Sequence, residues 1–241
     1  MLIFLDLETT GLEEDAKICA IAIIAVEAEK IKEVLYEFIN EGKKIPPNAS
    51  AIHHITNEMI HGMSSFKESK SYKFLEANNN PNATIIVHNA KFDKERLRTS
   101  GYEFLGEFID TLRVTKHLIP ECGFFSLQFL RYELKLYKQE KQAALACNYE
   151  KAIEAHNAFG DVLVTKLLYE YLLEIADKEK MQALSKQHVL VQLLPFGKYE
   201  GQYIEEIASC DRGYLEWIIA NITDLDDDLR YSIDYYLRGN L

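Results

Sequence analysis

The sequence predicts an α/β protein in which a mixed central sheet is flanked by helices and followed by a small C-terminal module. Three observations predict this architecture: three neighbouring strand-like segments, an alternation of strand and helix patterns after them, and a separate apolar block at the end of the chain. With 241 residues and 48% hydrophobic content, the chain is long enough to bury a sizeable core.

The first segments are rich in Ile, Val, Leu and aromatic residues, which is typical of strands packed on a core. They cover residues 2–7, 17–27 and 31–38. Because they follow one another closely, we expect an antiparallel meander. The next segment opens with two prolines and is therefore expected to begin as a loop. Two short helices should follow it, one starting after Asn48 or Ser50 and another after Thr56.

The middle of the chain alternates between the two patterns. Residues 83–88 predict a buried strand, residues 90–101 a helix closed by Gly101, and residues 106–111 another strand. This alternation indicates parallel strands joined by crossover helices. The part from Thr111 to Leu173 is mostly helical by pattern, and we expect the apolar face of its last helix to lie against the sheet.

Two domains are expected from this organisation. The first covers residues 1–178 and the second residues 189–241, with a hydrophilic linker at about residues 179–188. In the second domain, Gly197 and Gly201 predict a tight hairpin, and Asp211 is a predicted helix N-cap.

The charge balance is unusual for a protein that binds a polyanion. The net charge is −11, and residues 1–180 and residues 181–241 are both net acidic, so neither part is a basic arm. A polyanionic substrate would then be held through bound cations and a local basic patch. The densest basic cluster, Lys91, Lys94, Arg96 and Arg98, is either such a patch or a solvated helix face.

The cysteines and the apolar segments indicate where in the cell the protein is expected. Cys19, Cys122, Cys147 and Cys210 are far apart and include no CxxC pair, which argues against a zinc site or a disulfide framework and favours a cytoplasmic location. No segment approaches the roughly 18 apolar residues of a membrane helix, and no basic stretch precedes the first apolar run. We therefore expect neither a membrane span nor a signal peptide.

Two carboxylates lie at the end of the first predicted strand. Asp6 and Glu8 are separated by one residue, so both side chains project from the same face. Two such charges repel unless a cation lies between them, and hard oxygen ligands favour Mg²⁺ or Mn²⁺. Taken alone, the pair also fits a strand that ends in a solvated turn. The small residues that follow place backbone N–H groups where a phosphate or terminal nucleotide would bind, although such a turn is also a common strand exit.

Three further residues complete the candidate chemistry. Asp93 lies near the start of a predicted helix, at the carboxyl end of a predicted strand, where ligand sites gather in α/β sheets. His156 and Asp161 are five residues apart, which on a helix is about 140° away from a shared face. They converge only if His156 lies just outside the helix that carries Asp161, an arrangement suited to a mobile general base beside a fixed metal ligand.

Three blocks of the sequence, DLETTGL, HNAKFD and HNAFGD, resemble the ordered motifs of the DEDD family of 3′-to-5′ exonucleases, which have an RNase H-like fold. The resemblance covers about residues 1–175. A histidine five residues before the last aspartate is the pattern of the DEDDh (DnaQ-like) branch, whereas the tyrosine branch has a tyrosine where this chain has Asn157.

This resemblance implies roles for the five residues. Asp6, Glu8 and Asp161 would bind two Mg²⁺ ions directly, with Mn²⁺ as a substitute, and Asp93 would assist through water. His156 would deprotonate the attacking water, so that a nucleoside 5′-monophosphate is released.

The resemblance also implies substrate contacts. The segment SAIHHITNEM is similar to the family loop that faces the terminal nucleotide, and IDTLR, at residues 109–113, resembles a structural segment. The substrate candidates are Thr9, Thr10, Gly11, Leu12, His53, Ile55, Asn89 and Phe92. For the apolar Leu12, a core contact is the equal alternative.

The C-terminal block, beginning LPFGKYEGQY, resembles the end of the exodeoxyribonuclease X group of this family. Its aromatic residues fit either the core of a small module or a nucleic-acid contact. Basic residues of that group appear here as Glu200, Gln202 and Glu216, which puts DNA binding by the module in doubt but not its fold.

The sequence therefore predicts a metal-dependent exonuclease that acts on DNA 3′ ends, single-stranded or duplex, in repair or end trimming. The alternatives are an RNA 3′ exonuclease of the RNase T or oligoribonuclease kind and a polymerase proofreading subunit. A non-catalytic nucleic-acid-binding module is disfavoured, because such a scaffold has no physical need for four converging carboxylates.

Overall fold

The computed structural model describes residues 1–151 and 153–239. The chain forms two compact units, of which the first covers Met1–Ser185 and the second begins at Lys186. None of the helices in the described residues combines the length and the apolar character needed to span a bilayer.

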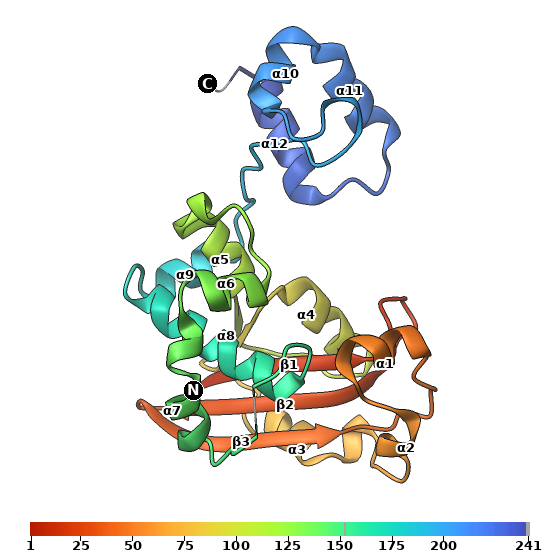
Figure 1. Cartoon of the computed structure of the whole chain (residues 1–241), viewed down its shortest axis with the longest axis vertical. Helices are drawn as coiled ribbons and strands as arrows, with labels where there is room; N and C mark the ends of the chain where they lie inside the picture. Colours follow the sequence, from red (N-terminus) through yellow and green to blue (C-terminus); the bar gives the residue numbers. More distant parts are fainter. Residues whose placement is uncertain (152, 240–241) are drawn as a thin grey trace. The chain divides into compact units, whose positions relative to one another are not determined.

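A five-stranded sheet forms the centre of the first unit (Figure 1), in the order β3-β2-β1-β4-β5. β1 pairs antiparallel with β2 and parallel with β4; β3 is antiparallel to β2, and β5 is parallel to β4. The strands are β1 (Leu2–Thr9), β2 (Ile18–Glu27), β3 (Lys30–Phe38), β4 (Thr84–Val87) and β5 (Glu107–Asp110). The predicted mixed sheet, with an antiparallel meander followed by parallel strands, is confirmed.

Helices cover both faces of this sheet (Figure 1). Those of the first unit are α1 (Pro47–His53), α2 (Asn57–Ile60), α3 (Lys70–Ala77), α4 (Ala90–Thr99), α5 (Thr111–Leu118), α6 (Leu127–Glu133), α7 (Glu140–Ala146), α8 (Ala158–Leu173) and α9 (Lys178–Leu184). Single 3₁₀ turns cover Phe66–Glu68, Pro120–Cys122 and Leu136–Lys138.

The central strand β1 is buried on both faces, and its side chains divide between two cores. Ile3, Leu5 and Leu7 pack with residues of α3 and α4. Phe4 points the other way and meets Tyr169 of α8 edge to face, with ring centroids 5.5 Å apart. Because side chains alternate along a strand, Asp6 and Glu8 share the face of Phe4, toward α8.

Two segments differ from the boundaries expected from the sequence. The first short helix begins at Pro47, ahead of both expected starts, because proline suits the first turn of a helix, where its missing N–H costs nothing. The second begins directly after Thr56, as predicted. Residues 178–184 of the hydrophilic stretch form α9, and its Met181 and Leu184 are buried in the core under α8.

The second unit is a small helical module with its own core. It contains α10 (Ile204–Cys210), α11 (Arg212–Asn221) and α12 (Asp227–Leu237), and a 3₁₀ turn at Gly197–Tyr199. Leu215 and Ile218 of α11 are fully buried in this core. The side chain of Asp211 accepts a hydrogen bond from the Tyr214 N–H, which confirms the predicted N-cap.

Candidate active site

Three carboxylates meet at the end of β1. Asp6 and Glu8 extend from β1, and Asp161 extends from the first turn of α8, so that carboxylate oxygens of all three lie within 4.8 Å of one another. Asp93 of α4 and His156 line the same hollow, whose volume is about 710 Å³. The structure thus brings together all five residues that the sequence singled out for chemistry.

Burial and mutual repulsion favour the protonated forms of these carboxylates. Burial, with the nearby Asp161, raises the pKa of Glu8 to about 8. The pKa of Asp6 is raised well above its usual range by burial and then by the charges of its acidic neighbours, and that of Asp93 by burial and by Asp110. The pKa of Asp161 rises to about 6 through burial, although His156 and Gln128 counteract the rise.

This donor set fits a divalent metal ion. Within the described part of the chain, no lysine or arginine is ion-paired with Asp6, Glu8 or Asp161. Buried carboxylates that repel one another require a compensating cation when they are ionised. Hard oxygen ligands from two elements at this spacing are those that Mg²⁺ or Mn²⁺ prefers.

His156 lies just outside α8, as its spacing from Asp161 predicts. The helix begins at Ala158 with Asn157 as its N-cap, and His156 is exposed with a φ of 55°. The segment before it passes so close to α8 that a Cβ on Gly160 would lie 2.4 Å from the Glu154 carbonyl oxygen. Because Gly160 has no Cβ, the segment that carries His156 can pack directly against α8.

The turn before α4 is fixed by Asp110 at the end of β5. Its carboxylate accepts hydrogen bonds from the Asn89 N–H at 3.1 Å and the Ala90 N–H at 2.9 Å. Asn89 itself has a φ of 78°, a conformation that asparagine tolerates better than most residues. Asp110 thereby sets the direction in which α4 leaves the sheet, and with it the position of Asp93.

A smaller hollow of about 230 Å³ lies beside Glu8. Five of the substrate candidates line it: Thr9, Gly11, Leu12, His53 and Phe92. The Leu12 side chain is 82% exposed, which excludes the core contact considered for it. Asn89 lines the larger hollow, and Phe92 lines both.

The other two candidates are placed away from both hollows. Thr10 is buried, and its hydroxyl accepts a hydrogen bond from the Lys17 N–H. Ile55 is only 2% exposed and packs in a small core under α1 and α2. Both residues therefore have structural contacts, and for the apolar Ile55 burial is favourable. A substrate contact at either residue stays a prediction.

His53 is held by backbone groups on both sides of its ring. Nδ1 accepts from the Ile55 N–H at 3.1 Å, so Nε2 carries the proton and donates to the Thr9 carbonyl oxygen, also at 3.1 Å. Burial lowers the pKa of His53, which favours this neutral ring. The hydrogen bond from His53 to the Thr9 carbonyl oxygen thus holds the end of β1 in place.

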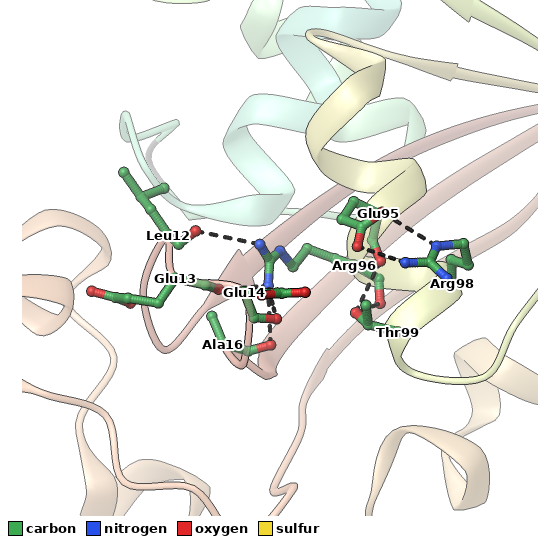
Figure 2. Close-up of polar contacts among 8 residues, drawn as sticks. All are labelled: Leu12, Glu13, Glu14, Ala16, Glu95, Arg96, Arg98 and Thr99. Carbon is green, nitrogen blue, oxygen red and sulfur yellow. Dashed lines mark hydrogen bonds and ion pairs between the residues drawn. The ribbon is translucent and has the colours of Figure 1, made fainter. Parts of the chain in front are cut away.

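Most side chains of the basic cluster on α4 interact with other groups of the protein. Figure 2 shows the buried Arg96 guanidinium reaching from α4 to the loop after β1, where it donates to the carbonyl oxygens of Leu12, Glu13, Glu14 and Ala16. Arg98 pairs with Glu95 on the surface, and Lys94 lies over the Phe108 ring. Arg96 and Arg98 therefore do not form the phosphate patch that was one of the two interpretations of this cluster.

One supporting residue could not be found from the sequence. Gln128 of α6 donates from Nε2 to Oδ1 of Asp161 at 2.8 Å. Gln128 also accepts from Arg131, which forms a buried ion pair with Glu140. A glutamine in a helical pattern carries no signal of this role, since only the tertiary fold places it against Asp161.

Comparison with known proteins identifies the family and agrees with the fold. A family model described as "Exonuclease" matches residues 3–169, and one described as "Exodeoxyribonuclease X-like C-terminal" matches residues 194–223. Exodeoxyribonuclease 10 of Escherichia coli (strain K12) is 27% identical over 241 residues, covering 99% of this chain and 100% of that protein. DNA polymerase III subunit epsilon of Treponema pallidum (strain Nichols) is 26% identical, covering 68% of this chain and 72% of that protein.

Solved structures show the same architecture. A structure of exonuclease X in complex with 5′ overhanging duplex DNA aligns with a TM-score of 0.60 and 25% identity, covering 77% of this chain and 99% of that chain. The nuclease domain of 3′hExo, a DEDDh family member bound to rAMP, shares the fold with a TM-score of 0.54 at 10% identity, over 73% of this chain and 92% of that chain. The family match spans more than half of the chain, and the chain therefore belongs to the DEDDh exonuclease family, with an exodeoxyribonuclease X-like C-terminal module.

Proposed function

We propose that this protein is a metal-dependent 3′-to-5′ exodeoxyribonuclease that releases nucleoside 5′-monophosphates from DNA 3′ ends. The observation that carries the proposal is the convergence of Asp6, Glu8 and Asp161 in a hollow that Asp93 and His156 also line. A binding module would gain nothing from four carboxylates that line one hollow, two of them buried and two half-buried, because their mutual repulsion lowers stability.

The carboxylates are assigned to the metal ions. Asp6, Glu8 and Asp161 would hold two Mg²⁺ ions, with Asp93 completing the set, and Mn²⁺ would substitute. When bound, these ions supply positive charge that offsets the carboxylates and stabilises the charge that develops on the reacting phosphate. Gln128 orients Asp161 through its 2.8 Å hydrogen bond.

His156 is assigned as the general base. It is exposed at the rim of the hollow and outside α8, so its ring can approach a water molecule beside the carboxylates. His156 accepts a proton from this water while the water oxygen forms a bond to the terminal phosphorus. The bond to the 3′ oxygen of the preceding nucleotide breaks, and this oxygen takes a proton from solvent. The products are a shortened strand with a 3′ hydroxyl and a free 5′-monophosphate, and His156 then returns its proton to solvent.

We propose DNA as the substrate because the relative that matches 99% of this chain is an exodeoxyribonuclease. Exodeoxyribonuclease 10 is matched over its full length, and the C-terminal module also matches the exodeoxyribonuclease X-like model. We therefore propose action on DNA ends, in repair or end trimming in the cytoplasm. Similarity to DNA polymerase III subunit epsilon favours a proofreading subunit as the second candidate.

One gel experiment tests this function. The protein is incubated with 5′-labelled DNA and RNA oligonucleotides, each with Mg²⁺, with Mn²⁺ and with EDTA. Asp6→Ala and the isosteric Asp6→Asn serve as controls, because each removes a carboxylate while only the first removes its volume. We expect a ladder of shortened DNA with either metal ion, none with EDTA, and a loss of activity in both variants.

The other outcomes distinguish the alternatives. DNA that stays intact under every metal condition contradicts the proposal. Shortening of RNA alone favours an RNA exonuclease. Activity that appears only when a polymerase subunit is added favours the proofreading subunit.

A further inference from the structure

The larger hollow, of about 710 Å³, is lined by more negative than positive side chains. Four carboxylates line it, and among its lining residues Lys116 is the only side chain with a permanent positive charge. A phosphodiester strand that enters this hollow carries a negative charge at each linkage. The position of Lys116 therefore bears on how the strand is held.

Lys116 reaches the hollow from α5. Leu112 lies one turn earlier and lines the hollow as well, which places both residues on one helix face. In the part of the chain that the structure describes, the Lys116 ammonium has no hydrogen bond and no ion pair. Its three donors are thus available to a ligand, unlike those of Arg96, which are bonded to backbone carbonyls.

An exposed aromatic ring lines the same hollow. Phe124 is 71% exposed, and its ring leans on Phe129, with centroids 5.4 Å apart. The segment is fixed from inside by His88, whose Nε2 lies 2.9 Å from the Phe125 carbonyl oxygen. Lys116 and Phe124 thus supply the hollow with a cation and an exposed aromatic ring, and proteins hold single-stranded nucleic acid with grooves that combine the two.

We propose that Lys116 is a phosphate-binding residue that holds the strand upstream of the bond that is cut. Its ammonium contacts the second phosphodiester from the 3′ end, the neighbour of the scissile one, while Phe124 offers a stacking surface to the attached base. This inference rests on the proposed function. Such a contact positions the strand without reading its sequence.

The first test compares Lys116→Ala with one variant that keeps the charge at this position and one that removes the same charge elsewhere. Lys116→Ala is measured beside Lys116→Arg and beside Lys73→Ala, which removes an exposed lysine from α3 on the other side of the sheet. For single-stranded DNA, Lys116→Ala should raise KM roughly tenfold with kcat within about twofold. The slope of log KM against log salt should decrease by about 0.7, the contribution of one phosphate on a single strand. Lys116→Arg and Lys73→Ala should both keep the wild-type slope.

The second test removes the charge from the substrate instead of from the protein. A methylphosphonate, which is uncharged, replaces the second phosphodiester from the 3′ end, and a distant linkage is replaced as control. The wild type should lose affinity only with the first oligonucleotide, and Lys116→Ala should not respond to either. Equal responses of the two proteins, or an unchanged KM in Lys116→Ala, would overturn the inference. A wild type that cuts no DNA overturns the proposed function instead.

Discussion

Gln128 and Asp161 are joined by a hydrogen bond of 2.8 Å between the amide Nε2 and the carboxylate Oδ1. Arg131 donates to the other side of the same amide at 3.1 Å, and Glu140 holds Arg131 in a buried ion pair. These contacts orient the Asp161 carboxylate of the candidate metal site. It also fixes which atom of Gln128 is the donor, because the guanidinium of Arg131 has no acceptor.

Replacing Gln128 by Leu should weaken metal binding. The Mg²⁺ concentration for half-maximal turnover should rise by roughly 10- to 100-fold, since outer contacts of metal ligands contribute at this level. Gln139→Leu, at an exposed position before α7, should leave the Mg²⁺ titration unchanged. A Gln128→Leu enzyme with the wild-type Mg²⁺ curve would show that this hydrogen bond does not support the metal site.

Replacing His156 by Ala should lower kcat by roughly two to four orders of magnitude, as expected for the loss of a general base. Mg²⁺ binding, followed by calorimetry, should persist because the three clustered carboxylates remain. His61→Ala, an exposed histidine after α2, provides the control. Unchanged turnover in His156→Ala would remove the assignment of this residue.

Without metal, the stability of the protein should fall as the pH rises. The folded state raises the pKa of Asp161 to about 6 and that of Glu8 to about 8, both through burial first, so it binds more protons than the unfolded chain above about pH 4. The Tm in EDTA should therefore decrease from pH 7 to pH 8, above the range in which the lowered pKa of His53 acts in the opposite direction. Mg²⁺ should raise the Tm more at pH 8 than at pH 6, because it binds the ionised carboxylates.

Thermal melts with EDTA and with Mg²⁺ at each pH check this expectation. Glu8→Gln should flatten the profile in EDTA, since it removes the group that titrates over the widest range. A Tm in EDTA that increases between pH 7 and pH 8 would contradict the assignment of a raised pKa to Glu8.

Arg96 and Arg98 provide a matched pair two residues apart on one helix. Arg96→Met removes the donors to four carbonyl oxygens and should lower the free energy of unfolding by roughly 1–3 kcal/mol. Cleavage after Glu13 or Glu14 by a glutamate-specific protease should become faster. Arg98→Met, which loses only a surface pair with Glu95, should change neither measurement. Equal behaviour of both variants would show that Arg96 does not hold the loop.

A chain that ends at Ser185 should keep exonuclease turnover. Every residue assigned to metal, base or substrate lies in the first unit, and α9 completes its core. Comparing kcat of this shortened chain with that of the whole protein checks the expectation, with circular dichroism to verify folding. A folded but inactive chain would assign the C-terminal module a part in catalysis.

The sequence predicted those features that depend on local periodicity. Alternation along a strand placed Asp6 and Glu8 on one face, and helical spacing placed His156 outside the helix of Asp161, as the structure confirms. Side chains whose role depends on tertiary contacts were not predictable. Gln128 touches Asp161 across 33 residues, and Arg96 reaches the Leu12 carbonyl across 84.

The side chains of β1 divide between two cores, and this limits which mutations the site can accept during evolution. A one-residue slip of β1 would turn Leu5 and Leu7 toward α8 and bury Asp6 and Glu8 among apolar side chains. A single-residue insertion or deletion in this strand would therefore damage fold and chemistry together. Stable but inactive descendants are therefore expected to arise by substitution of single site residues and not by insertions or deletions in β1.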